Sequence, residues 1–122
     1  MARILLVDDE TAVRQLFADV LEIDAHAVTQ AGDGNGALAA LEHGAFDLVV
    51  TDLVMPDKEG IETIIEMRKR WPTLPVVAMS GGGRGSAADY LELAAQLGAV
   101  ATLQKPFATQ VLLDTVRKVL DR

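Results

Sequence analysis

Five short apolar runs alternate with amphipathic stretches along the whole chain, and this alternation constrains the fold more than any other feature. The runs lie at Ile4–Val7, Ala27–Ala31, Leu48–Thr51, Val76–Ser80 and Ala101–Leu103. Each run is short and bounded, as expected for a strand buried within a parallel sheet. Strands that alternate with single helices, repeating about every 25 residues, indicate βαβ units with right-handed crossovers. The sequence therefore predicts an α/β fold.

The stretches between the runs have the spacing of helices that lie on a sheet. Their apolar residues recur three, four and seven positions apart, which places one stripe against the sheet. The five stretches include Leu16, Leu38, Ile64, Leu91 and Val116. Gly44, Gly98 and the pair Trp71-Pro72 are expected to end helices. No linker or low-complexity segment interrupts the pattern, so we expect a single domain over residues 1–122.

Composition excludes several classes of function. Of 122 residues, 50% are hydrophobic and 24% are charged, as in an ordinary globular domain. The net charge of -7 argues against nucleic acid or an anionic membrane as a direct partner. The sequence has no cysteine, which excludes thiolate chemistry. The first strand begins almost at once and no apolar run is long enough for a membrane helix, so a cytoplasmic location is expected.

Charged residues lie just past the ends of three of the apolar runs. Asp8 and Asp9 follow the first, Asp52 the third and Lys105 the fifth. If these strands share one sheet, three carboxylates and one ammonium converge at its C-terminal edge, where open α/β sheets bind their ligands. Closely packed carboxylates repel one another, and Mg²⁺ is the natural ion to neutralise them. This arrangement makes Asp52 a candidate acceptor for a phosphoryl group.

Each of these residues also has an ordinary explanation when it is taken alone. Asp8 and Asp9 could mark a helix start, because acids favour the N-terminal end of the helix dipole. Ser80 could cap the helix that follows the fourth run. Asp52 and Lys105 could be solvated loop residues. The combination favours a phosphoacceptor site, because otherwise four unrelated explanations would have to apply at the ends of four different strands.

Several motifs together give the chain a resemblance that extends from end to end. They are Val7-Asp8-Asp9-Glu10, Asp52-Leu53-Val54-Met55-Pro56-Asp57, Gly60, Ser80-Gly81, Gly98-Ala99 and Lys105-Pro106-Phe107. The chain resembles the receiver domain of two-component response regulators, and in particular the single receivers of the chemotaxis type. The resemblance implies a doubly wound, flavodoxin-like fold: a five-stranded parallel sheet in the order 2-1-3-4-5 with five helices. It also implies a switch that takes a phosphoryl group from a histidine kinase or phosphotransfer protein.

The resemblance assigns roles to individual residues. It makes Asp52 the phosphoacceptor, and it makes Asp9, Asp52 and the backbone carbonyl of Val54 direct ligands of Mg²⁺. Asp8 would take part through a bound water. The ion would offset charge on the phosphoryl oxygens during in-line transfer.

The resemblance also implies how the phosphoryl group is held and how the switch is read. Lys105 and the Ser80 hydroxyl would contact the phosphoryl oxygens, and the bond before Pro106 would be cis. Such a protein is not a metabolic enzyme and catalyses only its own phosphorylation and dephosphorylation. A downstream protein would bind the face formed by the fourth helix, fifth strand and fifth helix, from Ala87 to Leu120.

Two features limit what the resemblance predicts about switching. Thr102 occupies the position where the family often carries Tyr or Phe, so the usual coupling of a hydroxyl to an aromatic ring is in doubt. Tyr90 is a possible substitute, although a half-buried helix aromatic is the favoured interpretation. Val54 and Gly82 would border the path of an attacking water without orienting it, which predicts slow to moderate self-dephosphorylation.

The sequence is also compatible with two other functions. Gly32-Asp33-Gly34-Asn35-Gly36-Ala37 fits the G-x-G-x-x-A pattern of a nucleotide or flavin binder, although it follows the second strand rather than the first. A tight turn before a helix is the simpler interpretation. A phosphate-independent interaction module of receiver type is the other alternative. The glycine-rich segment Gly81–Gly85 is interpreted as a mobile joint, and His26 and His43 as surface residues outside the site.

Overall fold

The computed structural model describes residues 2–53, 60–81 and 87–121, and it contains five strands alternating with five helices. The strands are β1 (Arg3–Val7), β2 (Ala27–Ala31), β3 (Leu48–Asp52), β4 (Val76–Ser80) and β5 (Ala101–Gln104). The helices are α1 (Thr11–Ile23), α2 (Gly34–His43), α3 (Gly60–Arg70), α4 (Ala87–Gln96) and α5 (Thr109–Leu120). All five predicted strands are confirmed, and their bounds differ from the predicted runs by at most one residue at either end.

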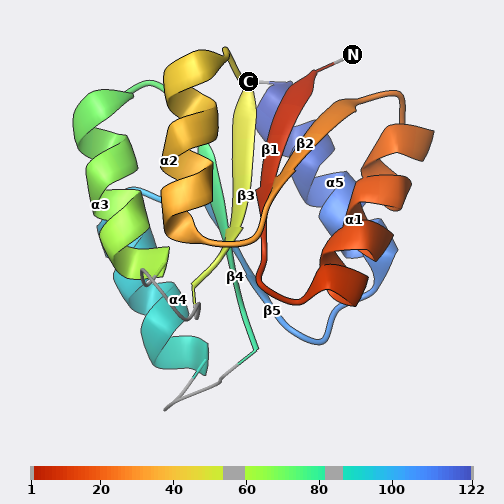
Figure 1. The fold of residues 1–122 in the computed structure, drawn as a ribbon. Coiled ribbons are helices and arrows are strands. Elements are labelled where there is room, and N and C mark those ends of the chain that lie inside the picture. Colours follow the sequence, from red (N-terminus) through yellow and green to blue (C-terminus); the bar gives the residue numbers. More distant parts are fainter. Residues whose placement is uncertain (1, 54–59, 82–86, 122) are drawn as a thin grey trace.

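The strands form one parallel sheet in the order β2-β1-β3-β4-β5. This is the predicted order, with the chain reversing direction across the sheet after β2. Figure 1 shows α1 and α5 on one face of the sheet and α2, α3 and α4 on the other. The fold is therefore the predicted doubly wound α/β architecture, in which the crevice at the C-terminal edge is the expected ligand site.

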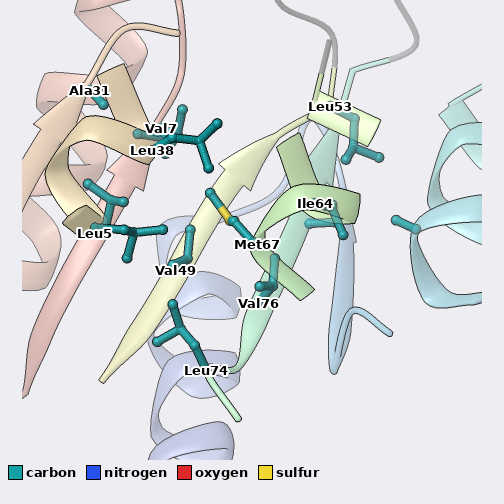
Figure 2. Close-up of a cluster of buried hydrophobic side chains, with 14 of the residues drawn as sticks. Leu5, Val7, Ala31, Leu38, Val49, Leu53, Ile64, Met67, Leu74 and Val76 are labelled. Carbon is teal, nitrogen blue, oxygen red and sulfur yellow. The ribbon is translucent and has the colours of Figure 1, made fainter. Parts of the chain in front are cut away.

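Each face of the sheet has its own hydrophobic core. Alternate residues of a strand point to opposite faces, so Leu5 and Val49 contribute to one core while Leu6 and Val50 contribute to the other. The core under α2, α3 and α4 is drawn in Figure 2, where Met67 and Ile64 of α3 lie over the central strands. The central strands β3 and β4 are buried along their whole length, as expected for strands covered on both faces.

Short turn signals set the ends of several helices. The Asp33 side chain accepts a hydrogen bond of 2.7 Å from the Gly36 backbone N–H and so caps the start of α2. Gly44 is the C-cap of α2, and Gly98 follows α4 with a φ of +106°, a conformation that favours glycine. Both glycines therefore end helices as predicted.

No helix in the described part of the chain combines the length and the apolar character needed to cross a lipid bilayer.

Candidate functional site

Strand register brings the predicted site residues together at one edge of the sheet. Val7 pairs with Thr51, so Asp8 and Asp52 occupy neighbouring positions at the ends of β1 and β3. On the other side, the Lys105 backbone N–H donates a 2.9 Å hydrogen bond to the Ser80 carbonyl, just past the end of β5. The convergence expected from the sequence is therefore present in the fold.

Lys105 joins two of the carboxylates. Its ammonium Nζ lies 2.7 Å from Asp8 Oδ2 and 3.4 Å from Asp52 Oδ2. The side chain of Lys105 is 15% exposed, while those of Asp8 and Asp52 are 0% and 7% exposed. Charge-assisted hydrogen bonds of this kind are stronger than neutral ones, because the donor and the acceptor carry opposite charges.

The environment of Lys105 has opposing effects on its pKa. Burial alone would lower the pKa, because it disfavours the charged ammonium. The hydrogen bond to Asp8 and the negative charges of Asp52 and Asp8 outweigh burial, so the pKa of Lys105 lies above its ordinary value. The lysine is therefore firmly protonated at neutral pH and acts as a fixed cation.

The three aspartates satisfy the geometric requirement for a bound divalent cation. Asp8, Asp9 and Asp52 each offer a carboxylate oxygen, and these oxygens lie within 4.8 Å of one another. Two of the side chains are buried and that of Asp9 is exposed, so the cluster is open to solvent on one side. Carboxylate oxygens with an open side suit Mg²⁺, which takes one or two carboxylates and keeps several waters. The donor set therefore fits the predicted ion.

The backbone around Asp52 is closely packed by α3. The Gly60 backbone N–H donates to the Leu53 carbonyl at 3.0 Å. A Cβ atom at Gly60 would lie 2.4 Å from Leu53 Cα and 2.5 Å from the Asp52 carbonyl oxygen. Only glycine allows the start of α3 to approach this closely, so Gly60 fixes the backbone that carries the candidate acceptor.

Ser80 and Gly81 shape the opposite wall of the site. Ser80 is fully buried at the last position of β4. The stem of Lys105 lies along Gly81, since a Cβ atom there would be 3.6 Å from both Cβ and Cδ of the lysine. The peptide bond between Lys105 and Pro106 is cis, as the resemblance implied.

Several predicted residues lie outside the described residues or away from the site. Val54 and Gly82 fall in segments 54–59 and 82–86, which the structure does not describe. Thr102 lies on β5 and is exposed. Tyr90 lies in α4, although its side chain is outside the described part of the structure.

The histidines lie outside the site, as expected, but the prediction that both are surface residues is wrong for His26. His43 is exposed, whereas the side chain of His26 is only 10% exposed. His26 Nδ1 accepts a 3.2 Å hydrogen bond from the Ala2 backbone N–H at the N-terminal edge of the sheet. A polar residue between a helix and an edge strand gives no periodic signal that would predict this burial.

The glycine-rich turn after β2 has a structural role. Its Asp33 caps α2, and Asp52 contacts Lys105, as described above. These contacts favour the interpretation of a tight turn over that of a nucleotide-binding loop.

One residue beside the site carried no signal in the sequence. Arg14 of α1 donates from Nη1 to the Asp8 carbonyl oxygen at 2.7 Å. An arginine in an amphipathic helix ordinarily lies on the solvated face, so its position in the sequence does not distinguish it from other surface arginines.

Comparison with known proteins agrees with the geometry. Residues 4–117 match the family model described as "Response regulator receiver domain". The chain is 38% identical over 122 residues to the transcriptional regulatory protein CpxR of Escherichia coli K12, covering all of this chain and 50% of CpxR. It is 33% identical over 123 residues to the chemotaxis protein CheY of Pseudomonas aeruginosa, covering 98% of this chain and 97% of CheY.

A solved structure shares the fold closely. The response regulator receiver domain protein from Clostridium thermocellum superposes with a TM-score of 0.91 at 31% identity, covering 100% of this chain and 96% of that one. The chain spans about half the length of the CpxR proteins that it matches, 24% of the response regulator FleR of Pseudomonas aeruginosa, and nearly all of CheY. With its sheet order, its acidic cluster and these matches, the chain belongs to the response regulator receiver domain family.

Proposed function

We propose that this chain is a signalling switch that is phosphorylated on Asp52. The observation that carries the proposal is the contact of one ammonium, Lys105 Nζ, with both Asp8 and Asp52 in a cluster of three carboxylates. An acceptor carboxylate needs a cation at hand when it receives a charged phosphoryl group, and Lys105 is positioned to supply one.

Asp52 is the nucleophile in the proposed reaction. One of its carboxylate oxygens forms a bond to phosphorus while the bond from phosphorus to the donor's nitrogen or oxygen breaks. The leaving group keeps the electron pair and takes up a proton from solvent. Lys105 and the Ser80 hydroxyl then contact the phosphoryl oxygens, and the acyl phosphate is the product.

Asp9, Asp52 and the backbone carbonyl of Val54 would hold Mg²⁺ directly, and Asp8 would hold it through a water. When bound, the ion offsets the negative charge that gathers on the phosphoryl oxygens. Asp8 also keeps the Lys105 ammonium within reach of Asp52 through their 2.7 Å contact. The carboxylates thus serve both to bind the ion and to position the lysine.

The donor in the cell would be a histidine kinase or a phosphotransfer protein, and the site lies in the cytoplasm. The downstream partner would bind the face formed by α4, β5 and α5. Exposed apolar side chains on the two helices include Leu93 of α4 at 41% and Val111 of α5 at 42% exposure. Self-dephosphorylation is proposed to be slow to moderate, because neither Val54 nor Gly82 can orient a water with its side chain.

Intact mass after incubation with acetyl phosphate tests this function. We expect one added phosphoryl group that depends on Mg²⁺ and is absent from Asp52→Asn. Asp47→Asn, which removes a carboxylate at the opposite edge of the sheet, should be modified like the wild type. If rapid sampling finds no adduct on the wild-type chain, the phosphate-independent interaction module becomes the better description.

A further inference from the structure

The guanidinium of Arg14 connects three segments beside the acidic cluster. Nη1 donates to the Asp8 carbonyl oxygen at 2.7 Å, and Nε donates to Gln30 Oε1 on β2 at 3.0 Å. Nη1 also lies against Gly32, where a Cβ atom would approach it to 3.3 Å. Arg14 therefore links the turn after β1 to the end of β2 and to the turn that follows it.

Sheet geometry explains why the Asp8 carbonyl needs this partner. The Asp8 backbone N–H donates to the Ala31 carbonyl at 3.1 Å, so the Asp8 carbonyl also points toward β2. β2 ends at Ala31, opposite Val7, and the chain then turns into α2. β2 therefore offers no further ladder hydrogen bond to the Asp8 carbonyl. A backbone carbonyl left without a hydrogen bond near the protein interior destabilises the fold. Arg14 supplies the hydrogen bond instead.

Asp8 is held at both its backbone and its side chain. Its Oδ1 accepts a 3.0 Å hydrogen bond from the Glu10 backbone N–H, and its Oδ2 contacts Lys105. Arg14 fixes the carbonyl that leads directly into Asp9. The positions of both carboxylates relative to Asp52 thus depend on a turn that Arg14 holds against β2.

We propose that Arg14 is a positioning residue that sets the affinity of the acidic cluster for Mg²⁺. Mg²⁺ demands near-ideal octahedral geometry, so small shifts of its ligands weaken binding. Groups that hold metal ligands in place commonly change metal affinity about 10- to 100-fold when they are replaced. The inference rests on the proposed function, since it concerns the same site.

The sign of the effect separates positioning from simple charge. Removing the positive charge of Arg14 reduces repulsion of a cation bound nearby, which by itself would tighten Mg²⁺ binding. Loss of the hydrogen bonds to Asp8 and Gln30 would loosen the turn and weaken binding. The two effects are opposite, so a single measured affinity decides between them.

The experiment compares Mg²⁺ affinities of the wild type and four variants, measured from amide chemical shifts during a Mg²⁺ titration. We expect Arg14→Met to bind Mg²⁺ about tenfold more weakly. Arg14→Lys keeps the charge and one donor and should fall in between. Gln30→Met removes the second anchor of the guanidinium and should cause a smaller loss. Lys118→Met removes one positive charge from an exposed position on α5 and should match the wild type.

A second readout separates positioning from a general loss of structure. The rate of phosphorylation by acetyl phosphate should need more Mg²⁺ in Arg14→Met, yet approach the wild-type rate at saturation. Unfolding curves establish that each variant is folded. Mg²⁺ affinity that is unchanged or tighter in Arg14→Met would overturn the inference, while a wild-type chain that binds Mg²⁺ but takes no phosphoryl group would overturn the proposed function alone.

Discussion

The two edges of the sheet differ in how their charged side chains are arranged. At the N-terminal edge, Asp24 pairs with Arg117 at 2.8 and 3.0 Å, and the exposed Arg70 pairs with Glu42 at 2.7 Å. At the C-terminal edge, the carboxylate oxygens of three aspartates lie within 4.8 Å of one another, and the two buried aspartates contact one lysine. The first edge pairs opposite charges, whereas the second has more negative than positive charge, and two of its three carboxylates are buried.

Paired surface charges and clustered buried charges contribute differently to stability. Balanced pairs at the surface contribute little, because solvent screens them and the side chains lose freedom on pairing. Like charges held close together destabilise the folded chain unless a cation binds. Such strain persists where function needs it, so the imbalance supports the proposal that a cation and a phosphoryl group bind at the C-terminal edge.

The two edges should differ most in the stability that is lost when the basic side chain of each is replaced. Lys105→Met leaves the buried Asp8 carboxylate without its positively charged partner, which should lower the free energy of unfolding by about 3 kcal/mol without Mg²⁺. Arg117→Met removes an exposed partner of Asp24, so its loss should be much smaller. Urea unfolding with and without Mg²⁺, followed by fluorescence of the single tryptophan Trp71, measures both.

Added Mg²⁺ is the control for this pair of variants. It should restore part of the stability of Lys105→Met, because the ion takes over the neutralisation of the carboxylates. It should stabilise Arg117→Met by the same amount as it stabilises the wild type. Equal losses at the two edges would contradict the contrast between them.

Backbone packing should also differ between the edges. Gly60→Ala forces a Cβ atom against the backbone of Asp52 and Leu53, so the start of α3 must move. We expect a loss of about 2 kcal/mol in unfolding free energy together with slower phosphorylation. Gly44→Ala at the opposite edge meets its nearest neighbour at 3.5 Å, an ordinary contact, and should phosphorylate at the wild-type rate. If Gly60→Ala is phosphorylated as fast as Gly44→Ala, the packing of α3 does not position the acceptor.

Much of the architecture could be predicted because its signals are local and repeated. A buried parallel strand is a short apolar run, and each run in this chain has one helix after it. The site could be predicted for a related reason. Asp8, Asp52 and Lys105 lie at or directly beyond strand ends, so the sheet order is enough to bring them together.

The rest of the site depends on side-chain contacts between distant segments, which no local sequence pattern predicts. Arg14 has the spacing of a surface residue, and only the end of β2 beside the Asp8 carbonyl gives it a role. The burial of His26 likewise follows from the packing of its loop against the start of β1. Thr102 differs from these two residues. Its identity departs from the family pattern and is visible in the sequence, but its exposed position in the structure does not explain how the protein would switch.

Replacing Asp52, the proposed acceptor, should stabilise the metal-free protein. Asp52→Asn removes one of three clustered negative charges, so the unfolding free energy without Mg²⁺ should rise by about 1 kcal/mol. The same variant should gain less stability from added Mg²⁺ than the wild type, because it has lost a ligand. Urea unfolding in the presence and absence of a chelator measures both effects. A variant that is less stable than the wild type in chelator would show that repulsion at this edge is not the dominant force.

The smallest predicted effect concerns acid and the N-terminal edge. The hydrogen bond from Arg117 outweighs partial desolvation and lowers the pKa of Asp24 below its ordinary value of 3.8, with further help from the charges of Arg117 and His26. A carboxyl whose pKa is lower in the folded state stabilises the fold above its unfolded pKa, and this contribution is lost as the pH falls through the folded value. The difference in stability between wild type and Asp24→Asn should therefore be present near pH 5 and shrink as the pH falls below about 3.8. Asp114→Asn, which lies 4.0 Å from Arg117, is the matched control. A stability difference that grows on acidification would mean that Arg117 does not stabilise the Asp24 carboxylate. The charges at the N-terminal edge would then not form a stabilising pair.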